Sequence, residues 1–360
     1  MNSSASPLPL RPLGTSGLQV PTICLGTMTF GTQNTEAEAH AQLHHALEAG
    51  VTFWDTAELY PTNPVSAETY GDTERYIGNF FSIHGGREKV VLATKMAGPG
   101  RPHIRKGSGF APASIRAALE DSLARLKTDY VDLYQLHWPN RGSYHFSQQW
   151  AYAGPESPML KQTTARVEED MLATLETLGA LVKEGKIRHL GLSNETAWGT
   201  LTYLALAQKH TLPRMVSIQN EYSLLCRLYE PELAEISLRE NISLLPWSPL
   251  AGGILSGKYF GGARPEGSRI TLPGYSGLSR LTPHTQSAAD AYTSLAHQHG
   301  LNPAQMALAF TLTRPYVAST IIGATTLAQL KTNIAAAHLV LSPEVLEGIE
   351  AIYRNYTMPY

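Results

Sequence analysis

The sequence predicts an α/β fold, a single (β/α)8 barrel of the TIM type, on three observations. Short apolar segments alternate with longer amphipathic ones along all 360 residues, eight of the short segments have the character of strands, and no linker, internal repeat or low-complexity tract divides the chain. Eight strands separated by helices over this length favour a closed parallel barrel that forms one domain, residues 1–360. Counting strands leaves a doubly wound open sheet as the alternative.

The predicted strands are rich in Val, Ile, Leu or aromatic residues and are bounded by Gly, Pro or polar residues. In chain order they are Ile23–Gly26, Thr52–Asp55, Val90–Lys95, Val131–His137, His189–Ser193, Val216–Gln219, Ser243–Trp247 and Thr320–Gly323. Apolar residues at helical spacing fill the intervals, and glycines such as Gly50 and Gly185 end two of the helices. The predicted helices are Glu36–Ala49, Ala113–Leu126, Val167–Lys183, Thr196–Gln208, Glu230–Glu240, Ser287–His299, Asn302–Thr313 and Leu327–His338.

Two kinds of segment interrupt this alternation. Leu10–Pro21 has the pattern of a small hairpin before the first strand, preceded by a flexible N-terminus over residues 1–9; a helix and tail are expected over 342–360. Long connections follow several strands, and in a barrel such loops lie on the face that carries the active site. These connections are Pro61–Thr69, Gly98–Ala111, Trp138–Arg166 and Gly252–Pro283.

The composition excludes several classes of partner. The chain has 28 Lys and Arg against 30 Asp and Glu, for a net charge of −2, so no nucleic-acid partner is expected. Cys24 and Cys226 are the only cysteines, which favours a reducing compartment over a disulfide framework. The start of the chain lacks a secretory signal, and no apolar stretch approaches the roughly 20 residues that span a bilayer. We therefore expect a cytoplasmic protein without a membrane partner; self-association stays open.

Four titratable residues of different chemistry lie at the ends of predicted strands. Asp55, Lys95 and His137 close the second, third and fourth strands, and Tyr60 follows Asp55 by five positions, so all four should share one rim of the barrel. Hydride reduction of a carbonyl leaves an alkoxide that needs a proton. Tyr60 can donate it if Lys95 lowers the phenol pKa and Asp55 holds Lys95, while His137 orients the carbonyl. Taken alone, Asp55 and Lys95 fit a structural ion pair equally well.

The motifs around these four residues resemble those of the aldo-keto reductase superfamily, nearest to bacterial NADP(H)-dependent members close to the potassium-channel β-subunit branch. The similarity runs from about Leu10 to about Leu346. Its motifs are Leu25–Met28, Asp55–Tyr60, Thr94–Lys95, Asp132–Pro139, Gly185–Arg188, Gly191–Asn194 and Gln219–Ser223. The resemblance implies NADPH-dependent reduction of an aldehyde or ketone to an alcohol, with Asp55, Tyr60, Lys95 and His137 as the catalytic residues.

The resemblance also implies which residues hold the cofactor, NADPH or NADP+, without a metal. Ser193, Asn194 and Gln219 match positions that bind the nicotinamide carboxamide, and Trp247 matches the aromatic residue that supports its ring. Arg269 is the expected partner of the 2′-phosphate, because Gln329 stands where some reductases carry an arginine; this makes NADPH the preferred cofactor over NADH. The full expected set is Gly26, Thr27, Met28, Asp55, Ser193, Asn194, Gln219, Trp247, Ser248, Pro249, Leu250, Gly253, Leu255, Lys258, Ser268, Arg269, Gly323, Thr325, Gln329 and Asn333.

A small-molecule carbonyl compound is the expected partner. Aromatic residues of the long connection after the fourth strand are expected to line its pocket with the catalytic residues, which suggests an apolar or aromatic aldehyde or ketone. The expected substrate residues are Tyr60, His137, Trp138, Trp150 and Tyr152.

Other functions fit parts of the sequence. Channel β subunits share the motifs, so a regulatory subunit with slow turnover is the main alternative. A Schiff-base lyase would need a neutral Lys95, which Asp55 opposes. Gly252–Tyr259 approaches a phosphate-binding P-loop, but Tyr259 replaces the required Ser or Thr. His40 and His44 have the spacing of zinc ligands, yet no glutamate base lies between them, so a solvated helix face is expected.

Overall fold

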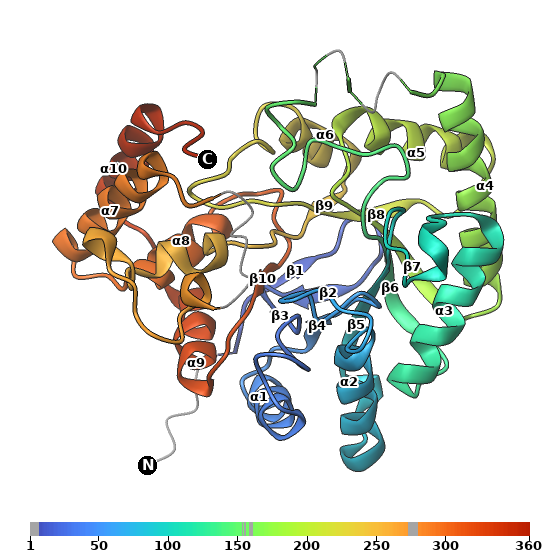
Figure 1. Ribbon diagram of the computed structural model, residues 1–360, viewed down its shortest axis with the longest axis horizontal. Coiled ribbons are helices and arrows are strands. Elements are labelled where there is room, and N and C mark those ends of the chain that lie inside the picture. The colour runs from blue at the N-terminus through green and yellow to red at the C-terminus, as the bar shows by residue number, and fades with distance from the viewer. Residues whose placement is uncertain (1–6, 153, 155, 158–160, 273–279) are drawn as a thin grey trace.

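Eight parallel strands form the centre of the protein (Figure 1). The computed structural model describes residues 7–152, 154, 156–157, 161–272 and 280–360. In the order in which they pair, the strands are β10 (Thr320–Ile322), β3 (Ile23–Gly26), β4 (Phe53–Asp55), β5 (Val91–Met96), β6 (Val131–Leu136), β7 (Ile187–Ser193), β8 (Met215–Gln219) and β9 (Ser243–Leu244). All eight predicted strands are confirmed, although β9 ends three residues before the predicted Trp247.

The two edge strands of this sheet are joined to each other. Leu244 of β9 forms a parallel bridge with Val317, just before β10, and the amide of Ile321 donates a hydrogen bond of 3.0 Å to the carbonyl of Pro246. Because both edges are paired, the sheet closes into a barrel. The predicted barrel is confirmed, and the doubly wound open sheet is excluded.

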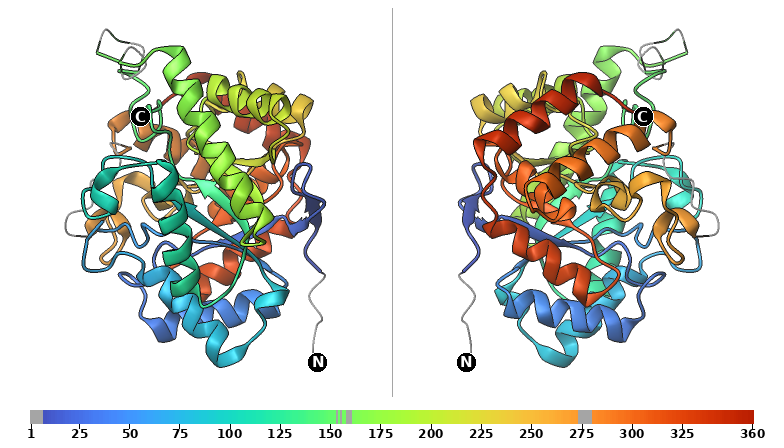
Figure 2. Two further views of the ribbon diagram at one scale, coloured as in Figure 1. Left: turned by 90° about the vertical axis from the view of Figure 1, so that its right-hand side faces the viewer. Right: turned by 90° about the vertical axis from the view of Figure 1, so that its left-hand side faces the viewer.

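Helices surround the strands on the outside, as two further views show (Figure 2). They are α1 (Glu36–Glu48), α2 (Asp72–His84), α3 (Pro112–Leu126), α4 (Thr164–Lys183), α5 (Ala197–Lys209), α6 (Leu233–Glu240), α7 (Pro283–Gln298), α8 (Pro303–Leu312), α9 (Leu327–Ala335) and α10 (Pro343–Asn355). The predicted helices all form, with ends that differ by a few residues. Side-chain caps fix several starts, as where Thr35 and Glu38 form a reciprocal capping box before α1.

Helix α2 is missing from the predicted set, because its sequence carries weak helix signals. Gly71 at its N-cap offers no side-chain hydrogen bond, and Gly78 in its middle is a poor helix former. The structure gives the reason for Gly78: a Cβ atom at this position would lie 2.1 Å from the carbonyl oxygen of Arg125 at the end of α3. Close packing of α2 on α3 therefore requires a glycine that local propensity disfavours.

The side chains that point into the barrel change character along each strand. Phe53, Ala93 and Leu133 belong to a buried inner cluster that also includes Cys24 and Leu245. Two residues further along the same strands, and so on the same face, stand Asp55, Lys95 and Gln135. The lower part of the barrel is thus filled by apolar side chains, and the polar side chains gather at the carboxyl ends of the strands.

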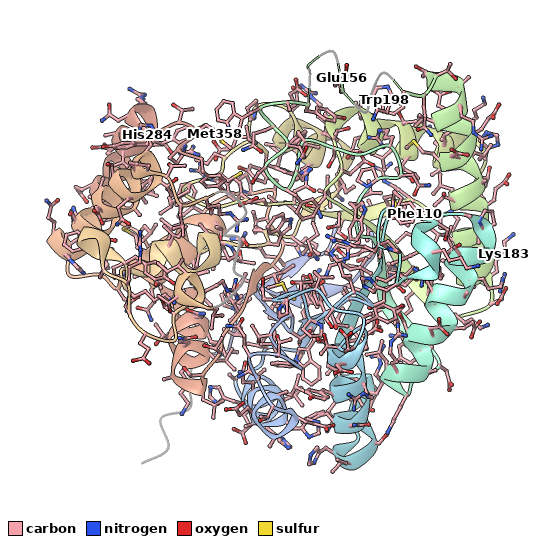
Figure 3. The ribbon with its side chains drawn as sticks, in the orientation of Figure 1. Phe110, Glu156, Lys183, Trp198, His284 and Met358 are labelled. Carbon is pink, nitrogen blue, oxygen red and sulfur yellow. The ribbon has the colours of Figure 1, made fainter. Side chains whose placement is uncertain are left out.

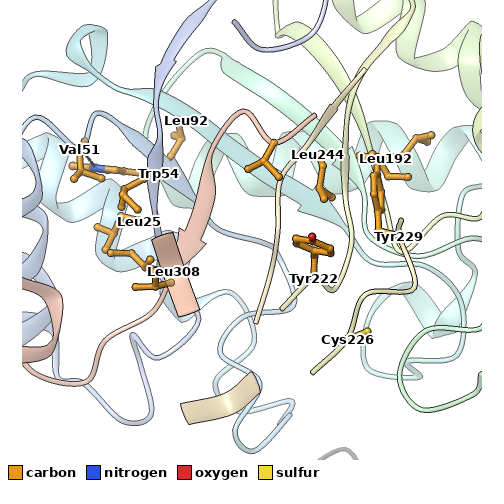
Figure 4. Close-up of a cluster of buried hydrophobic side chains, with 14 of the residues drawn as sticks. Leu25, Val51, Trp54, Leu92, Leu192, Tyr222, Cys226, Tyr229, Leu244 and Leu308 are labelled. Carbon is orange, nitrogen blue, oxygen red and sulfur yellow. Dashed lines mark hydrogen bonds between the residues drawn. The ribbon is translucent and has the colours of Figure 1, made fainter. Parts of the chain in front are cut away.

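A larger apolar cluster lies between the strands and the helices (Figure 4). Trp54 of β4 is fully buried there beside Leu25, and its indole donates a hydrogen bond of 2.9 Å to the carbonyl of Val51. Leu92 and Leu308 extend the same layer. This burial of large apolar side chains holds the helices against the barrel and so fixes the strand ends that carry the site.

The amino-terminal end of the barrel is closed by the predicted hairpin, β1 (Leu10–Pro12) and β2 (Gln19–Pro21). Its Leu13 and Val20 are fully buried in the inner cluster. Of the predicted flexible N-terminus, residues 1–6 lie outside the described residues. From Leu8 onward the segment is anchored, since Leu8 is buried and the carbonyl of Pro9 accepts a hydrogen bond of 2.9 Å from Thr22.

Candidate active site

Asp55, Lys95 and Tyr60 lie in direct contact at the carboxyl ends of β4 and β5. The Lys95 ammonium donates hydrogen bonds of 2.6 Å to Oδ2 of Asp55, 2.9 Å to the carbonyl of Thr56 and 3.3 Å to the hydroxyl of Tyr60. Lys95 is fully buried and Asp55 nearly so. The Lys95 ammonium is thus hydrogen-bonded both to the predicted carboxylate, Asp55, and to the predicted phenol, Tyr60.

His137 completes this group from the end of β6. Its imidazole meets the Tyr60 ring edge-on, with 5.7 Å between the centroids. Burial, and then the positive charges of Lys95 and Arg101, hold the His137 pKa well below its usual range. The imidazole is therefore neutral near pH 7, and a neutral imidazole carries one N–H that can donate to a substrate oxygen.

The charges of Lys95 and Tyr60 follow from burial and from their neighbours. Burial alone would lower the pKa of Lys95, but Asp55 and Tyr60 together raise it above the ordinary value, so the ammonium stays charged. Burial raises the pKa of Tyr60, and Lys95 lowers it by less. Lys95 lowers the Tyr60 pKa but offsets only part of the opposing effects of burial and Asp55, so the phenol remains protonated at neutral pH.

Asp55 is held by two further side chains inside the barrel. Its Oδ1 atom accepts hydrogen bonds of 3.1 Å from Gln135 and 2.9 Å from Gln219, and Gln219 also donates to Gln135 at 3.1 Å. Thr27 donates to the backbone carbonyl of Asp55 through both its amide and its hydroxyl. The carboxylate is thereby fixed on both oxygens. Gln135 was not among the predicted site residues, although it lies two positions before His137 on the inward face of β6.

The residues expected around the nicotinamide also form one connected group. Asn194 donates a hydrogen bond of 2.8 Å to the carbonyl of His137, and Trp247 donates one of 3.1 Å to the amide oxygen of Asn194. The Ser193 hydroxyl donates to the carbonyl of Gln219 at 2.9 Å. Amide and hydroxyl groups beside an indole ring are a donor and acceptor set that suits a carboxamide on a flat heterocycle.

Ser248, Leu250 and Lys258, which match the pyrophosphate positions of the family resemblance, lie on a segment with unusual backbone geometry. Ser248, Ala251, Gly252 and Gly253 have φ values of 51°, 48°, 70° and 99°. In a tight turn, successive backbone N–H groups can converge on one side and bind an anion. Lys258 adds a positive charge at this place. Its ammonium lies close to Gly253, since a Cβ atom built on that glycine would be 3.1 Å from Nζ of Lys258. The segment therefore fits a pyrophosphate.

The residues expected near the adenosine form local contacts of their own. Gln329 accepts hydrogen bonds from the amide and the hydroxyl of Thr325, at 3.0 and 3.1 Å, and Asn333 donates one of 3.1 Å to the carbonyl of Gly323. The remaining members of the expected set lie in other connections. Gly26 ends β3 and Met28 follows it; the connection from β9 to α7 contains Pro249, Leu250 and Leu255, and further along Ser268 and Arg269. Ser268 is buried.

The aromatic residues expected to line the substrate pocket are placed unequally. Trp138 contacts His137, with ring centroids 5.0 Å apart. Tyr152 meets the ring of Tyr144 edge-on, with 6.0 Å between the ring centroids. Trp150 is 72% exposed, so it lies on the surface rather than beside the four central residues.

Phe146, from the same connection, takes the more central position. Its ring stacks on Trp247 at 5.8 Å with an interplanar angle of 24°, and it also lies 6.4 Å from the ring of Trp138. A continuous series of rings therefore runs from Tyr60 through His137, Trp138 and Phe146 to Trp247. The sequence placed Phe146 in an aromatic loop but offered nothing to distinguish it from Trp150.

Glu58 and Arg105 are structural partners of the site that sequence reasoning missed. The fully buried Glu58 carboxylate accepts hydrogen bonds from both terminal nitrogens of Arg105, from the Tyr70 hydroxyl at 3.0 Å and from the Ala97 amide at 2.6 Å. Glu58 lies two residues before Tyr60, and Ala97 lies two residues after Lys95. In the sequence, the only indication of this role was that Glu58 is a charged residue inside the Asp55–Tyr60 motif.

Two other motifs of the sequence have local surroundings of their own, although the first also contains Gly253, Leu255 and Lys258 of the expected cofactor set. The P-loop-like segment continues into short 3-10 turns, and Tyr259 is buried. His40 contacts the carbonyl of Tyr76, while His44 lies 3.3 Å from His84. In the described ranges, no group of three or more His, Cys, Asp or Glu side chains is arranged to hold a metal ion. Nor does any helix among those residues have the length and apolar character to cross a membrane.

Comparison with known proteins assigns the family. The chain is 49% identical over 354 residues to protein tas of Escherichia coli, which covers 96% of this chain and 97% of that protein. It is 31% identical to a probable voltage-gated potassium channel subunit beta of rice (95% of this chain, 96% of the relative) and 29% identical to versiconal hemiacetal acetate reductase of Aspergillus parasiticus (95% and 96%). The model of the Aldo/keto reductase family matches residues 22–354, and the chain belongs to this family of oxidoreductases.

Proposed function

We propose that this protein reduces an aldehyde or ketone to the alcohol with NADPH, and that Tyr60 donates the proton. The observation that carries the proposal is the contact of Lys95 with both Asp55 and Tyr60 beside a neutral His137. This arrangement matches the needs of the reaction, because a carbonyl oxygen that gains negative charge requires a hydrogen-bond donor and then a proton.

Each residue has a separate task in this proposal. The His137 imidazole donates a hydrogen bond to the carbonyl oxygen and orients it toward Tyr60. Tyr60, protonated at neutral pH, transfers its proton to that oxygen as the alkoxide forms. The adjacent Lys95 ammonium stabilises the resulting phenolate, and Asp55 keeps Lys95 charged. When bound, the dinucleotide supplies the hydride.

The residues fit such a dinucleotide at two places. Ser193, Asn194 and Gln219 would hold the carboxamide against Trp247, and the left-handed backbone at Gly252 and Gly253 with Lys258 would hold the pyrophosphate. Arg269 is proposed to contact the 2′-phosphate and so to favour NADPH over NADH. Residues 1–360 form one domain in this proposal, with Tyr60, His137, Trp138 and Tyr152 toward the substrate and the exposed Trp150 outside this group.

The first test is the absorbance of NADPH when the purified protein is mixed with a panel of aldehydes, ketones and quinones. Consumption of NADPH that depends on the substrate, and is slower with NADH, supports the proposal. In the variant Tyr60→Phe, reduction should fall by at least a hundredfold or so while NADPH binding persists, because only the proton donor is removed. Full turnover by Tyr60→Phe would contradict the assigned role.

A regulatory subunit is the second candidate, and the similarity to the channel subunits of rice is the observation that favours it. Such a subunit would bind NADPH tightly and turn over slowly with every member of the panel. Because channel β subunits share the motifs that carry these four residues, turnover with the panel decides between the two candidates.

A further inference from the structure

The last residue of the chain is buried in the protein. Tyr360 is only 8% exposed, and after α10 the chain turns back toward the loops at the carboxyl ends of the strands (Figure 1). The hydroxyls of Thr282 and Thr285, at the start of α7, each donate a hydrogen bond of 2.9 Å to the carbonyl of Pro359. Gln149, from the connection after β6, donates one of 3.3 Å to the backbone oxygen of Tyr360. The tail is therefore fixed from two sides.

The tail passes beside α7 before it reaches this position. Figure 3 labels His284 of α7 and Met358 of the tail, and the His284 ring packs at 5.1 Å on the ring of Tyr356. Tyr356 is only partly buried, in contrast to Tyr360. The two tyrosines of the tail therefore have different surroundings, and only Tyr360 enters the loops above the barrel.

The Tyr360 hydroxyl ends on a buried ion pair. It donates a hydrogen bond of 2.8 Å to Oε1 of Glu221, and the same oxygen accepts two more from Arg280, at 3.0 and 2.7 Å. Arg280 is 3% exposed. Its guanidinium lies 5.7 Å from the ring centroid of Tyr360 and 5.7 Å from that of Trp247. Glu221 and Arg280 thus connect the tail to Trp247.

Trp247 depends on the same segment for its backbone position. Its amide donates to the carbonyl of Asn220 at 3.1 Å, and its carbonyl accepts from the amide of Tyr222 at 3.3 Å, on either side of Glu221. Arg280 meanwhile lies in the connection before α7 that also carries Ser268 and Arg269. The Glu221–Arg280 pair therefore joins the support of the nicotinamide to the connection proposed to hold the adenosine phosphate.

A small open cleft lies between the tail and Phe146, whose ring stacks on Trp247. Phe146, Glu221, Cys226, Met358 and Tyr360 are among its lining residues. Removal of the Tyr360 side chain would open this cleft further and leave Oε1 of Glu221 with one donor fewer. A buried oxygen that loses a hydrogen bond is destabilised, so Glu221 and Arg280 would lose their fixed position.

We propose that Tyr360 is a positioning residue that holds the Glu221–Arg280 pair against Trp247, so that the C-terminal tail sets how slowly the dinucleotide is released. The inference rests on the proposed function, in which Trp247 supports the nicotinamide. The tail is expected to slow dissociation of the dinucleotide and to leave proton transfer by Tyr60 unchanged.

The test compares Tyr360→Phe, which removes the hydroxyl that donates to Glu221, with Gln149→Leu, which removes the hydrogen bond to the backbone oxygen of Tyr360 and retains the Tyr360 side chain. Tyr356→Phe is the matched control in the same tail. The rate of NADPH dissociation is measured by stopped-flow fluorescence, together with KM for NADPH, kcat at saturating NADPH and the melting temperature. For Tyr360→Phe we expect dissociation and KM to rise roughly tenfold, the effect of one hydrogen bond to a charged group, with kcat retained.

Gln149→Leu should show a smaller change in the same direction, and Tyr356→Phe should behave like the wild type. Equal dissociation rates for Tyr360→Phe and wild type would overturn the inference, as would a fall in kcat with unchanged KM. A lower melting temperature alone, without faster dissociation, would show that Tyr360 only stabilises the fold and would also overturn it. Absence of NADPH binding by the wild-type chain would overturn the proposed function as well, which distinguishes the two failures.

Discussion

Glu58 and Arg105 form a two-point ion pair that ties the loop after β4 to the loop after β5, beside Tyr60 and Lys95. Glu58 also accepts a hydrogen bond from Ala97, and its own amide donates to the carbonyl of Lys95 at 3.2 Å. The segment that carries Tyr60 is therefore fixed to the end of the strand that carries Lys95. The distance between phenol and ammonium depends on this link.

Glu58→Gln should therefore reduce both stability and catalysis. The substitution preserves size but leaves the Arg105 guanidinium, which is largely buried, without a counter-charge; loss of one partner of a buried pair costs about 3 kcal/mol or more of the free energy of unfolding. Urea denaturation measures this loss, and kcat should fall because Tyr60 is less well fixed. Glu120→Gln is the control, since its pair with Lys186 is exposed and should change stability by less than about 1 kcal/mol. Equal stability of the two variants would contradict the argument.

Asp55→Asn should make the reduction rate sensitive to alkaline pH. In the wild type, Asp55 and Tyr60 keep the Lys95 pKa above its ordinary value despite burial. Without the carboxylate, burial lowers that pKa, so the ammonium is lost as pH rises through the lowered value and the phenolate is no longer stabilised. The profile of kcat from about pH 6 to pH 9 should be level for the wild type and should decline for Asp55→Asn. Parallel profiles would show that Lys95 keeps its charge without Asp55.

The features that the sequence predicted are those encoded locally. Strand ends such as Asp55 and Lys95 follow from short apolar segments and from the two-residue alternation along each strand, which places them on the inner face. Contacts between distant segments have no such local mark. Glu58 and Arg105 are 47 positions apart in the sequence, and Glu221 and Tyr360 are 139 apart. The residues around each of them do not indicate which distant side chain it contacts.

Helix α2 was overlooked for a related reason, and Gly78→Ala tests it. Local propensity predicts that alanine stabilises the middle of a helix by about 1 kcal/mol. The structure predicts the opposite sign, because the new methyl group would lie 2.1 Å from the Arg125 carbonyl oxygen and 2.8 Å from the Leu126 carbonyl carbon. Overpacking of this kind costs about 1–3 kcal/mol or more. Thermal unfolding of Gly78→Ala beside the exposed control Ser82→Ala gives the sign directly, and a gain in stability would show that α2 and α3 separate easily.

Acid should weaken the protein through His145, in the loop after β6. Burial lowers the pKa of His145 from 6.5 to about 3, and the side chain is 7% exposed. Below about pH 6.5 the unfolded chain therefore binds a proton at His145 that the folded chain excludes. The contribution of His145 to the free energy of unfolding is complete above that pH. It is lost on acidification, at up to about 1.4 kcal/mol per pH unit. His137 acts in the same direction. Free energies of unfolding between pH 7 and pH 5 should decline less steeply for His145→Asn than for the wild type, whereas the exposed control His210→Asn should keep the wild-type slope. An unchanged slope in His145→Asn would mean that the loop opens and the imidazole takes up its proton without unfolding of the barrel.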